Sequence, residues 1–82
     1  MSSSLPKSDA RAKKVAFSSD ELTVVLADGR RISVPLAWFP RLLRASPAQL
    51  ENYELLGDGA GIHWPDLDED LSVAGLLRAE GE

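Results

Sequence analysis

The most chemically capable side chains of this chain are concentrated in one segment, GIHWPDLDEDLS, at residues 61–72. The segment holds the single histidine, His63, and four carboxylates within residues 66–70. An imidazole beside a carboxylate can act as a general base, so a hydrolase that uses His63 with Asp66 or Asp68 is one hypothesis. That chemistry requires a substrate group within about 3 Å of the ring.

The alternation of side chains argues against catalysis at His63. Ile62 and Trp64 flank the histidine, and a short strand that turns both apolar side chains inward leaves the imidazole on the solvent side. The chain has no cysteine, which excludes a thiol nucleophile, a thiolate zinc site and a disulfide framework. We therefore predict a protein that is not an enzyme, with no catalytic residues, no metal site and no cofactor.

The same carboxylates copy the first three ligand positions of a calcium loop, D-x-D-x-D, at Asp66, Asp68 and Asp70. The match fails at the sixth and twelfth positions, where glycine and glutamate are required and this chain has leucines. Helix capping explains the carboxylates without an ion, because Asp66 with Glu69, or Asp70 alone, can begin a helix over residues 70–77. Weak binding of a divalent ion to this cluster is left open.

Charge is divided unevenly along the 82 residues. Residues 1–14 carry four cations and one acid (+3), and residues 15–82 carry five cations and twelve acids (−7), which together give the net charge of −4. An acidic body disfavours nucleic acid as a direct partner, because binding a polyanion needs clustered cations. No apolar run approaches the roughly 18 residues of a membrane span, and with the lack of cysteines this favours a cytoplasmic bacterial protein.

Residues 15–35 read as a β-meander. The stretch LTVVLADGRRISV places two β-rich runs around an Asp-Gly pair. A three-residue loop at residues 27–29 pairs Val24 with Ile32 and gathers the apolar side chains on one face, whereas a two-residue loop scatters them over both. Gly29 then requires a positive φ.

The remaining elements are short. Pro40 fits the first turn of a helix or 3₁₀ segment. Ser46 and Gln49 form a capping box for a helix over about 47–52, and residues 53–64 read as a hairpin around the turn GDGAG. The predicted fold class is α+β, a small antiparallel sheet of meander plus hairpin packed against two or three short helices.

The expected domain limits follow from composition. Residues 1–13 have almost no large apolar side chains, so they cannot bury enough surface to offset the entropy of ordering. We expect a disordered basic leader over residues 1–13, a single α+β domain over residues 14–78 and a frayed tail over residues 79–82.

Two kinds of residue are candidates for contact with a partner. Trp38, Phe39 and Trp64 are large rings, and a domain of this size can rarely cover every one of them. Arg41 and Arg44 lie about one helical turn apart and would share a face. We assign these five residues as the candidate partner-binding site.

Several motifs together resemble a bacterial family, the domain of unknown function DUF2442, from about Val15 to Leu77. They are the D-G-R turn, PLAWFPRL, the SPAQ helix start and GIHWPDLDEDLS. The resemblance implies a small α+β domain, usually cytoplasmic, often encoded beside another small uncharacterised protein in an arrangement similar to toxin–antitoxin pairs. Some relatives carry a helix-turn-helix domain next to this domain. Five residues follow Leu77 in this sequence, and we expect them to be too few to form such a domain. The family has no established enzyme activity or cofactor, so the resemblance implies no catalytic residues.

The leading functional hypothesis is a non-enzymatic protein-interaction module, an antitoxin-like partner of a small neighbouring protein. Its acidic surface and an apolar anchor such as Trp38 or Trp64 would cover a basic partner. The alternative is a DNA-associated transcriptional regulator that uses the basic leader and the arginines of the folded body, Arg30, Arg31, Arg41 and Arg44. A homodimer formed by pairing of sheet edges is left open, and no membrane partner is expected.

Overall fold

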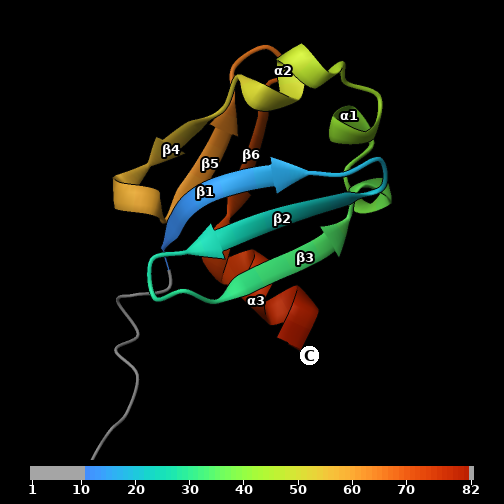
Figure 1. The fold of residues 1–82 in the computed structure, drawn as a ribbon. Helices are drawn as coiled ribbons and strands as arrows, with labels where there is room; N and C mark the ends of the chain where they lie inside the picture. The colour runs from blue at the N-terminus through green and yellow to red at the C-terminus, as the bar shows by residue number, and fades with distance from the viewer. Residues whose placement is uncertain (1–10, 82) are drawn as a thin grey trace, which may run out of the picture.

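The computed structural model describes residues 11–81, with side chains described as far as Arg78. The elements in chain order are β1 (Ala12–Phe17), β2 (Glu21–Leu26), β3 (Arg31–Pro35), η2 (Leu36–Trp38), α1 (Pro40–Leu43), α2 (Pro47–Glu51), β4 (Glu54–Leu56), η3 (Gly57–Gly59), β5 (Gly61–Trp64), β6 (Glu69–Ser72) and α3 (Val73–Gly81), where η marks a 3₁₀ turn (Figure 1). Strands β1–β3 form one antiparallel sheet and β4–β6 form a second. The α+β class is confirmed, but the strands are divided between two sheets where one was expected.

The first sheet has the predicted register. Val24 pairs with Ile32, and Leu22 pairs with Val34. All four side chains are buried, as expected when a period of two places one face of the sheet on the core. Gly29 has a φ of +94°, the left-handed conformation that the three-residue loop requires.

Strand β1 begins at Ala12, three residues before the expected start at Val15. A β-bulge lies between Ala12 and Lys14. The extra residue lets Ala12 and Val15 both point inward although they are three positions apart. The last two residues of the predicted leader therefore belong to the sheet, and its residues 1–10 lie outside the described part of the chain.

Helices α1 and α2, which connect the first sheet to the second along the chain, begin where the sequence predicts. Helix α1 starts at Pro40. In α2, the Ser46 hydroxyl accepts the backbone N–H of Gln49 at 3.2 Å, and the Gln49 side-chain oxygen accepts the N–H of Ser46 at 3.0 Å. This reciprocal pair is the predicted capping box.

The acidic segment after Trp64 forms a hairpin, which corrects the prediction that its carboxylates begin a helix. Strand β5 ends at Trp64, and the next four residues make a turn closed by a bond from the N–H of Leu67 to the Trp64 carbonyl at 3.1 Å. Asp68 lies in this turn with a φ of +52°, a conformation that aspartate tolerates better than most residues. The chain then returns along β5 as β6.

Helix α3 begins at Val73, later than predicted. The Ser72 hydroxyl accepts the N–H of Gly75 at 2.9 Å, so a serine caps this helix instead of an aspartate. The helical backbone continues to Gly81, through most of the segment 79–82 that was expected to fray. Residue 82 lies outside the described part of the chain.

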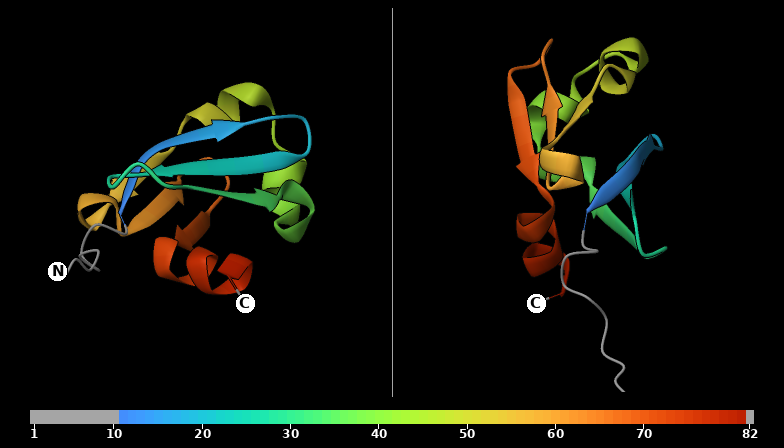
Figure 2. Two further views of the ribbon diagram at one scale, coloured as in Figure 1. Left: turned by 60° about the horizontal axis from the view of Figure 1, so that its bottom comes forward. Right: turned by 90° about the vertical axis from the view of Figure 1, so that its left-hand side faces the viewer.

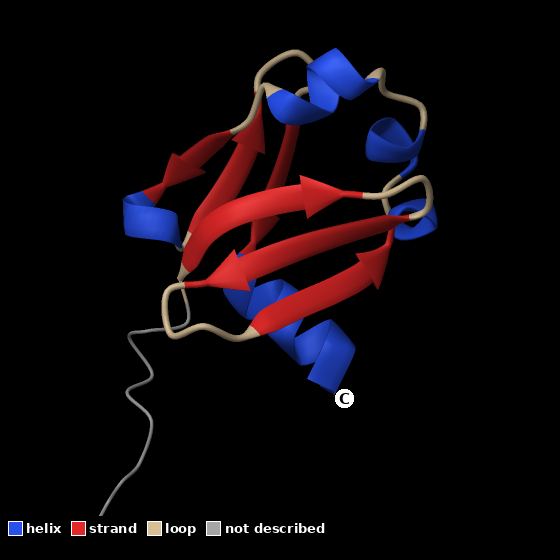
Figure 3. Ribbon diagram, viewed as in Figure 1, coloured by secondary structure: helices blue, strands red, loops and turns tan. Residues whose placement is uncertain are grey.

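The two sheets converge at one end of the molecule and diverge at the other (Figure 2). At the converging end, Gly59 has a φ of +102°, and a Cβ there would lie 2.3 Å from the carbonyl oxygen of Ala12. Glycine is therefore required for this approach of η3 to β1. Helices α1 and α2 lie over the diverging end (Figure 3).

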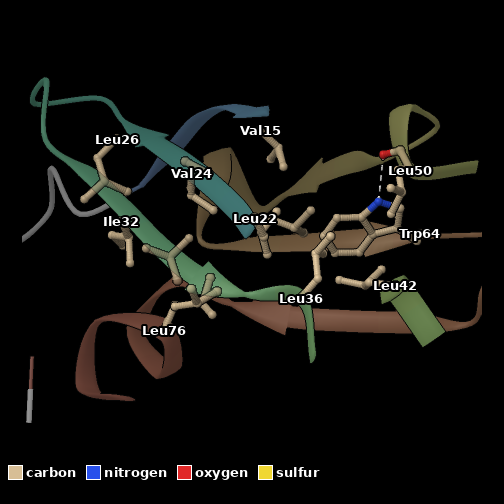
Figure 4. Packing of buried hydrophobic residues seen from close by; sticks show 14 residues of the cluster. Val15, Leu22, Val24, Leu26, Ile32, Leu36, Leu42, Leu50, Trp64 and Leu76 are labelled. Atoms are coloured by element: carbon tan, nitrogen blue, oxygen red, sulfur yellow. Dashed lines mark hydrogen bonds between the residues drawn. The ribbon is translucent and has the colours of Figure 1, made fainter. Parts of the chain in front are cut away.

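One apolar core fills the space between the sheets (Figure 4). Trp64 is its largest fully buried side chain, packed with Leu22, Leu36 and Leu42. The indole N–H of Trp64 donates to the carbonyl of Leu50 at 2.9 Å, which satisfies the ring's single polar group. Within the described residues, no helix is long and apolar enough to cross a membrane.

Candidate docking surfaces

The five residues predicted to contact a partner lie in different environments. Trp38 is on the surface with 51 % of its area exposed, and Phe39 beside it is half-buried. Arg41 and Arg44 are exposed on α1 and at its end. Trp64 has no exposed surface, so four of the five residues are accessible to a partner.

The burial of Trp64 removes it from the candidate anchors. The rings of Phe17 and Tyr53 pack against it, with centroids 6.4 and 6.3 Å away. The inward alternation of Ile62 and Trp64 was correctly predicted, and it is the reason that this ring serves the core. Trp38 is therefore the exposed tryptophan of the folded domain.

Trp38 forms one wall of a hollow of about 420 Å³ beside β6, which we call the Trp38 notch. Its other lining residues are Phe39, Asp70, Leu71, Ser72, Gly75 and Leu76. The notch lies along the outer edge strand of the second sheet. It combines an aromatic wall and an apolar floor with one carboxylate.

His63 and Asp70 face each other on neighbouring strands. The N–H of Val73 donates to the carbonyl of Ala60 at 2.9 Å, and bonded and non-bonded pairs alternate along an antiparallel ladder. His63 and Asp70 therefore form a non-hydrogen-bonded backbone pair, the type that brings side chains closest. Their Nδ1 and Oδ1 atoms are 2.5 Å apart.

The carboxylates around His63 favour its protonated form. The hydrogen bond to Asp70 is the main cause that raises the pKa of His63; the charges of Asp70, Glu54 and Asp68 add to it, and partial desolvation opposes it. The ring is on the outer side of the sheet with 28 % of its side chain exposed. The aspartate that bonds to the ring is Asp70, whereas the hydrolase hypothesis named Asp66 or Asp68.

Two carboxylates of the acidic segment are bonded to different side chains and are not gathered around one site. Asp66 accepts the side-chain N–H of Asn52 at 3.0 Å, while Asp70 bonds to His63. Within residues 11–81, no three histidine or acidic side chains are grouped closely enough to hold a metal ion. The D-x-D-x-D pattern therefore corresponds to a turn and a strand in this fold.

The arginines of the folded body do not form one basic surface. In the β2–β3 loop, Asp28 accepts the backbone N–H of Arg30 at 3.0 Å and the Nε–H of the same residue at 2.8 Å. The backbone bond is the main cause that lowers the pKa of Asp28; the side-chain bond adds to it, and partial desolvation opposes it. Arg41 donates to the carbonyls of Leu67 and Asp68, at 3.4 and 2.6 Å, and ties α1 to the β5–β6 turn. The β2–β3 loop and α1 lie at opposite ends of the first sheet (Figure 1), so these arginines offer no continuous stripe for DNA.

A larger hollow of about 840 Å³ runs along β1 toward α1 and α2, and we call it the β1 groove. Its apolar walls include Phe17, Leu36, Leu42, Leu43 and Leu50. Polar groups at its margins come from Lys14, Ser18, Ser19, Glu51 and Tyr53. Leu43 is 49 % exposed, although it belongs to a wall that is otherwise largely buried.

The backbone of β1 also points into this groove. The N–H of Ser18 donates to the carbonyl of Glu21 at 2.9 Å. By the alternation of the ladder, Ala16 is bonded to β2, while the N–H and C=O groups of Val15 and Phe17 point away from it. Because β1 is an edge strand, those groups face the groove.

Tyr53 closes one end of the exposed edge. Its hydroxyl accepts the N–H of Val15 at 3.1 Å, which leaves the Val15 carbonyl and the N–H and C=O of Phe17 directed into the β1 groove. This surface could not be predicted from the sequence, because it arises where β1 meets α2, which begins some 35 residues later in the chain. The one local signal was Leu43, an apolar residue placed between two arginines.

Comparison with known proteins gives a family and two similar structures. Residues 12–82 match the model of the family described as "Protein of unknown function (DUF2442)". A crystal structure of a protein of unknown function from Rhodospirillum rubrum superposes with a TM-score of 0.71 at 38 % identity, covering 84 % of this chain and 86 % of that one. An uncharacterized protein from Chromobacterium violaceum, solved by NMR, gives a TM-score of 0.71 at 26 % identity, covering 85 % of this chain and 66 % of that one. No curated protein matches the chain.

Proposed function

The chain belongs to the DUF2442 family of proteins of unknown function, and we propose that it is a protein-interaction module that acts by covering a partner, without catalysis. The observation that carries the proposal is the β1 groove. An apolar hollow beside an edge strand is a recurrent site for an added strand from another chain. Main-chain bonds then give affinity, and pockets for alternate side chains give specificity.

The groove offers both parts of such a site. Phe17 directs its backbone N–H and C=O outward, and Val15 directs its C=O outward. An incoming extended segment can pair with these groups while every second side chain enters the apolar hollow. Tyr53 occupies the Val15 N–H, so it sets where the added strand must end.

The partner that we propose is a small protein encoded beside this one, to which the domain binds in the manner of an antitoxin. Binding would cover the partner sterically, and no chemical step is involved. The acidic body, with a balance of −7 over residues 15–82, favours a basic partner and speeds the encounter. This mode of action fits a cytoplasmic protein.

A calorimetric titration of the purified domain with the product of the adjacent gene tests the proposal. Leu43→Asp puts a charge into the wall of the groove, where its desolvation opposes docking. We expect this variant to weaken binding by about tenfold or more. Leu56→Asp is the matched control, because Leu56 has a similar exposure of 46 % against 49 % for Leu43 and lies on β4, outside the lining of the groove.

Two outcomes contradict the proposal. One is the absence of binding heat at micromolar concentrations of both proteins. The other is an equal loss of affinity in Leu43→Asp and Leu56→Asp, which would assign the effect to the added charge and not to the groove. Circular dichroism of both variants verifies that each is folded before the titration.

A further inference from the structure

The Trp38 notch differs from the β1 groove in the groups that it presents. Trp38, half exposed, stands over an apolar floor that includes Leu71 and Leu76. The polar residues of the lining are Asp70 and Ser72. A π-face next to a carboxylate attracts a cation twice, once through the ring quadrupole and once through charge.

The charges around the notch have one predominant sign. Asp70 has 70 % of its side chain exposed, and Asp68 and Glu69 precede it in the same hairpin, whereas Asp66 is turned to Asn52. The nearby cation is Arg41, whose guanidinium is directed at the carbonyls of the β5–β6 turn. Charge complementarity therefore selects a cationic occupant for the notch.

We propose that the Trp38 notch docks a lysine or arginine side chain carried by an apolar segment of the partner protein. The cationic group lies against the Trp38 ring and pairs with Asp70, and apolar neighbours of that residue rest on the floor of the notch. This proposal rests on the proposed function in that it takes the partner to be a protein. It names the chemistry of a second contact, separate from the β1 groove.

Asp70 is shared between the notch and His63. The Oδ1 atom bonds to the imidazole at 2.5 Å, and in the proposed complex Oδ2 pairs with the docked cation. A protonated His63 competes with the ligand for this carboxylate. The groups that face the imidazole are Asp70 on β6, Glu54 on β4 and Asp68 in the turn, so protonation neutralises part of the negative field at the notch.

The test uses a capped peptide, glycine–leucine–arginine–leucine–glycine, followed by two-dimensional NMR of the whole chain. The control peptide replaces arginine with citrulline, which has a similar shape and no charge. We expect shifts centred on Trp38 and residues 70–76, with affinity about five- to tenfold higher for the arginine peptide. Asp70→Asn removes that difference, and Trp38→Ala weakens both peptides.

The pH dependence provides a second readout. Lowering the pH from about 8.5 to about 5.5, across the histidine range, should weaken arginine-peptide binding, and His63→Ala should abolish this dependence. Equal affinity for the two peptides, or shifts located elsewhere, overturns the inference. Because the peptides probe only the notch, this failure is distinct from loss of binding to the neighbouring protein in Leu43→Asp.

Discussion

The β1 groove and the Trp38 notch both lie at an edge of a sheet, but the interactions that they can make with a partner differ. The groove presents apolar walls and backbone groups of β1, which recognise shape and an extended main chain. The notch presents an aromatic face and a carboxylate, which recognise charge. A partner that uses both surfaces would therefore be selected twice, by the shape of its extended segment at the groove and by its charge at the notch.

One of the two tryptophans lies in the core and the other on the proposed contact surface, and we expect the largest change in stability from substitution of the buried one. Trp64→Ala removes a fully buried ring and its bond to Leu50, so we expect it to lower the free energy of unfolding by about 3–5 kcal/mol. Trp38→Ala removes a half-exposed ring and should stay within about 1 kcal/mol. Urea unfolding monitored by circular dichroism measures both, and similar losses would contradict the assignment of Trp38 to a contact surface.

Substitutions of Gly59 and Gly29 test whether the two sheets are held together at their converging end by the approach of η3 to β1. Gly59→Ala adds a Cβ that collides with the backbone of Ala12, and we expect a loss of about 2–3 kcal/mol. Gly29→Ala has a similar positive φ but open space around the added atom, so its loss should be about 1 kcal/mol. Thermal unfolding compares the two variants, and an equal loss would show that η3 does not press on β1.

The register of the first sheet and the cap of α2 could be predicted from sequence because they depend on residues that are close together in the chain. The pairing of Val24 with Ile32 follows from alternation within thirteen residues, and the Ser46 capping box lies within four. Both rules use only residues that are close together in the chain. The same locality explains why the inward position of Trp64 was predicted from its two neighbours.

The acidic hairpin and the division into two sheets could not be predicted in the same way. The carboxylates of residues 66–70 satisfy helix capping and a four-residue turn equally well, and the pairing of Leu71 with Ile62 decides between them. The two sheets approach each other where Gly59 meets the backbone of Ala12, and these residues are 47 positions apart in the chain. Tertiary contacts override local preference in both places.

A smaller effect is expected at the end of the groove. Tyr53→Phe removes the hydroxyl that accepts the Val15 N–H, and the loss of stability should be about 1 kcal/mol. The Val15 amide should exchange faster with deuterium, while the Ala16 amide, bonded within the sheet, keeps its protection. Unchanged exchange at Val15 would show that Tyr53 does not bound the open edge.

The effect expected in the titration of His63, which shares Asp70 with the notch, is smaller still. Its folded pKa is raised, so the stabilisation by Asp70 is complete below the unfolded pKa and is lost as the pH rises through the folded pKa. Asp70→Asn should lower the pKa of His63, and the single histidine makes its NMR titration unambiguous. A pKa that is the same in both proteins would remove Asp70 as the link between imidazole and notch.

Residue-resolved amide exchange of the domain, alone and saturated with the product of the adjacent gene, examines the groove most directly. In the unbound protein the Ala16 amide should be protected by β2 and the Phe17 amide should exchange rapidly. On binding, the Phe17 amide should become protected as an added strand accepts its N–H, with Ala16 unchanged. A Phe17 amide that stays rapid at saturation would contradict strand addition at β1.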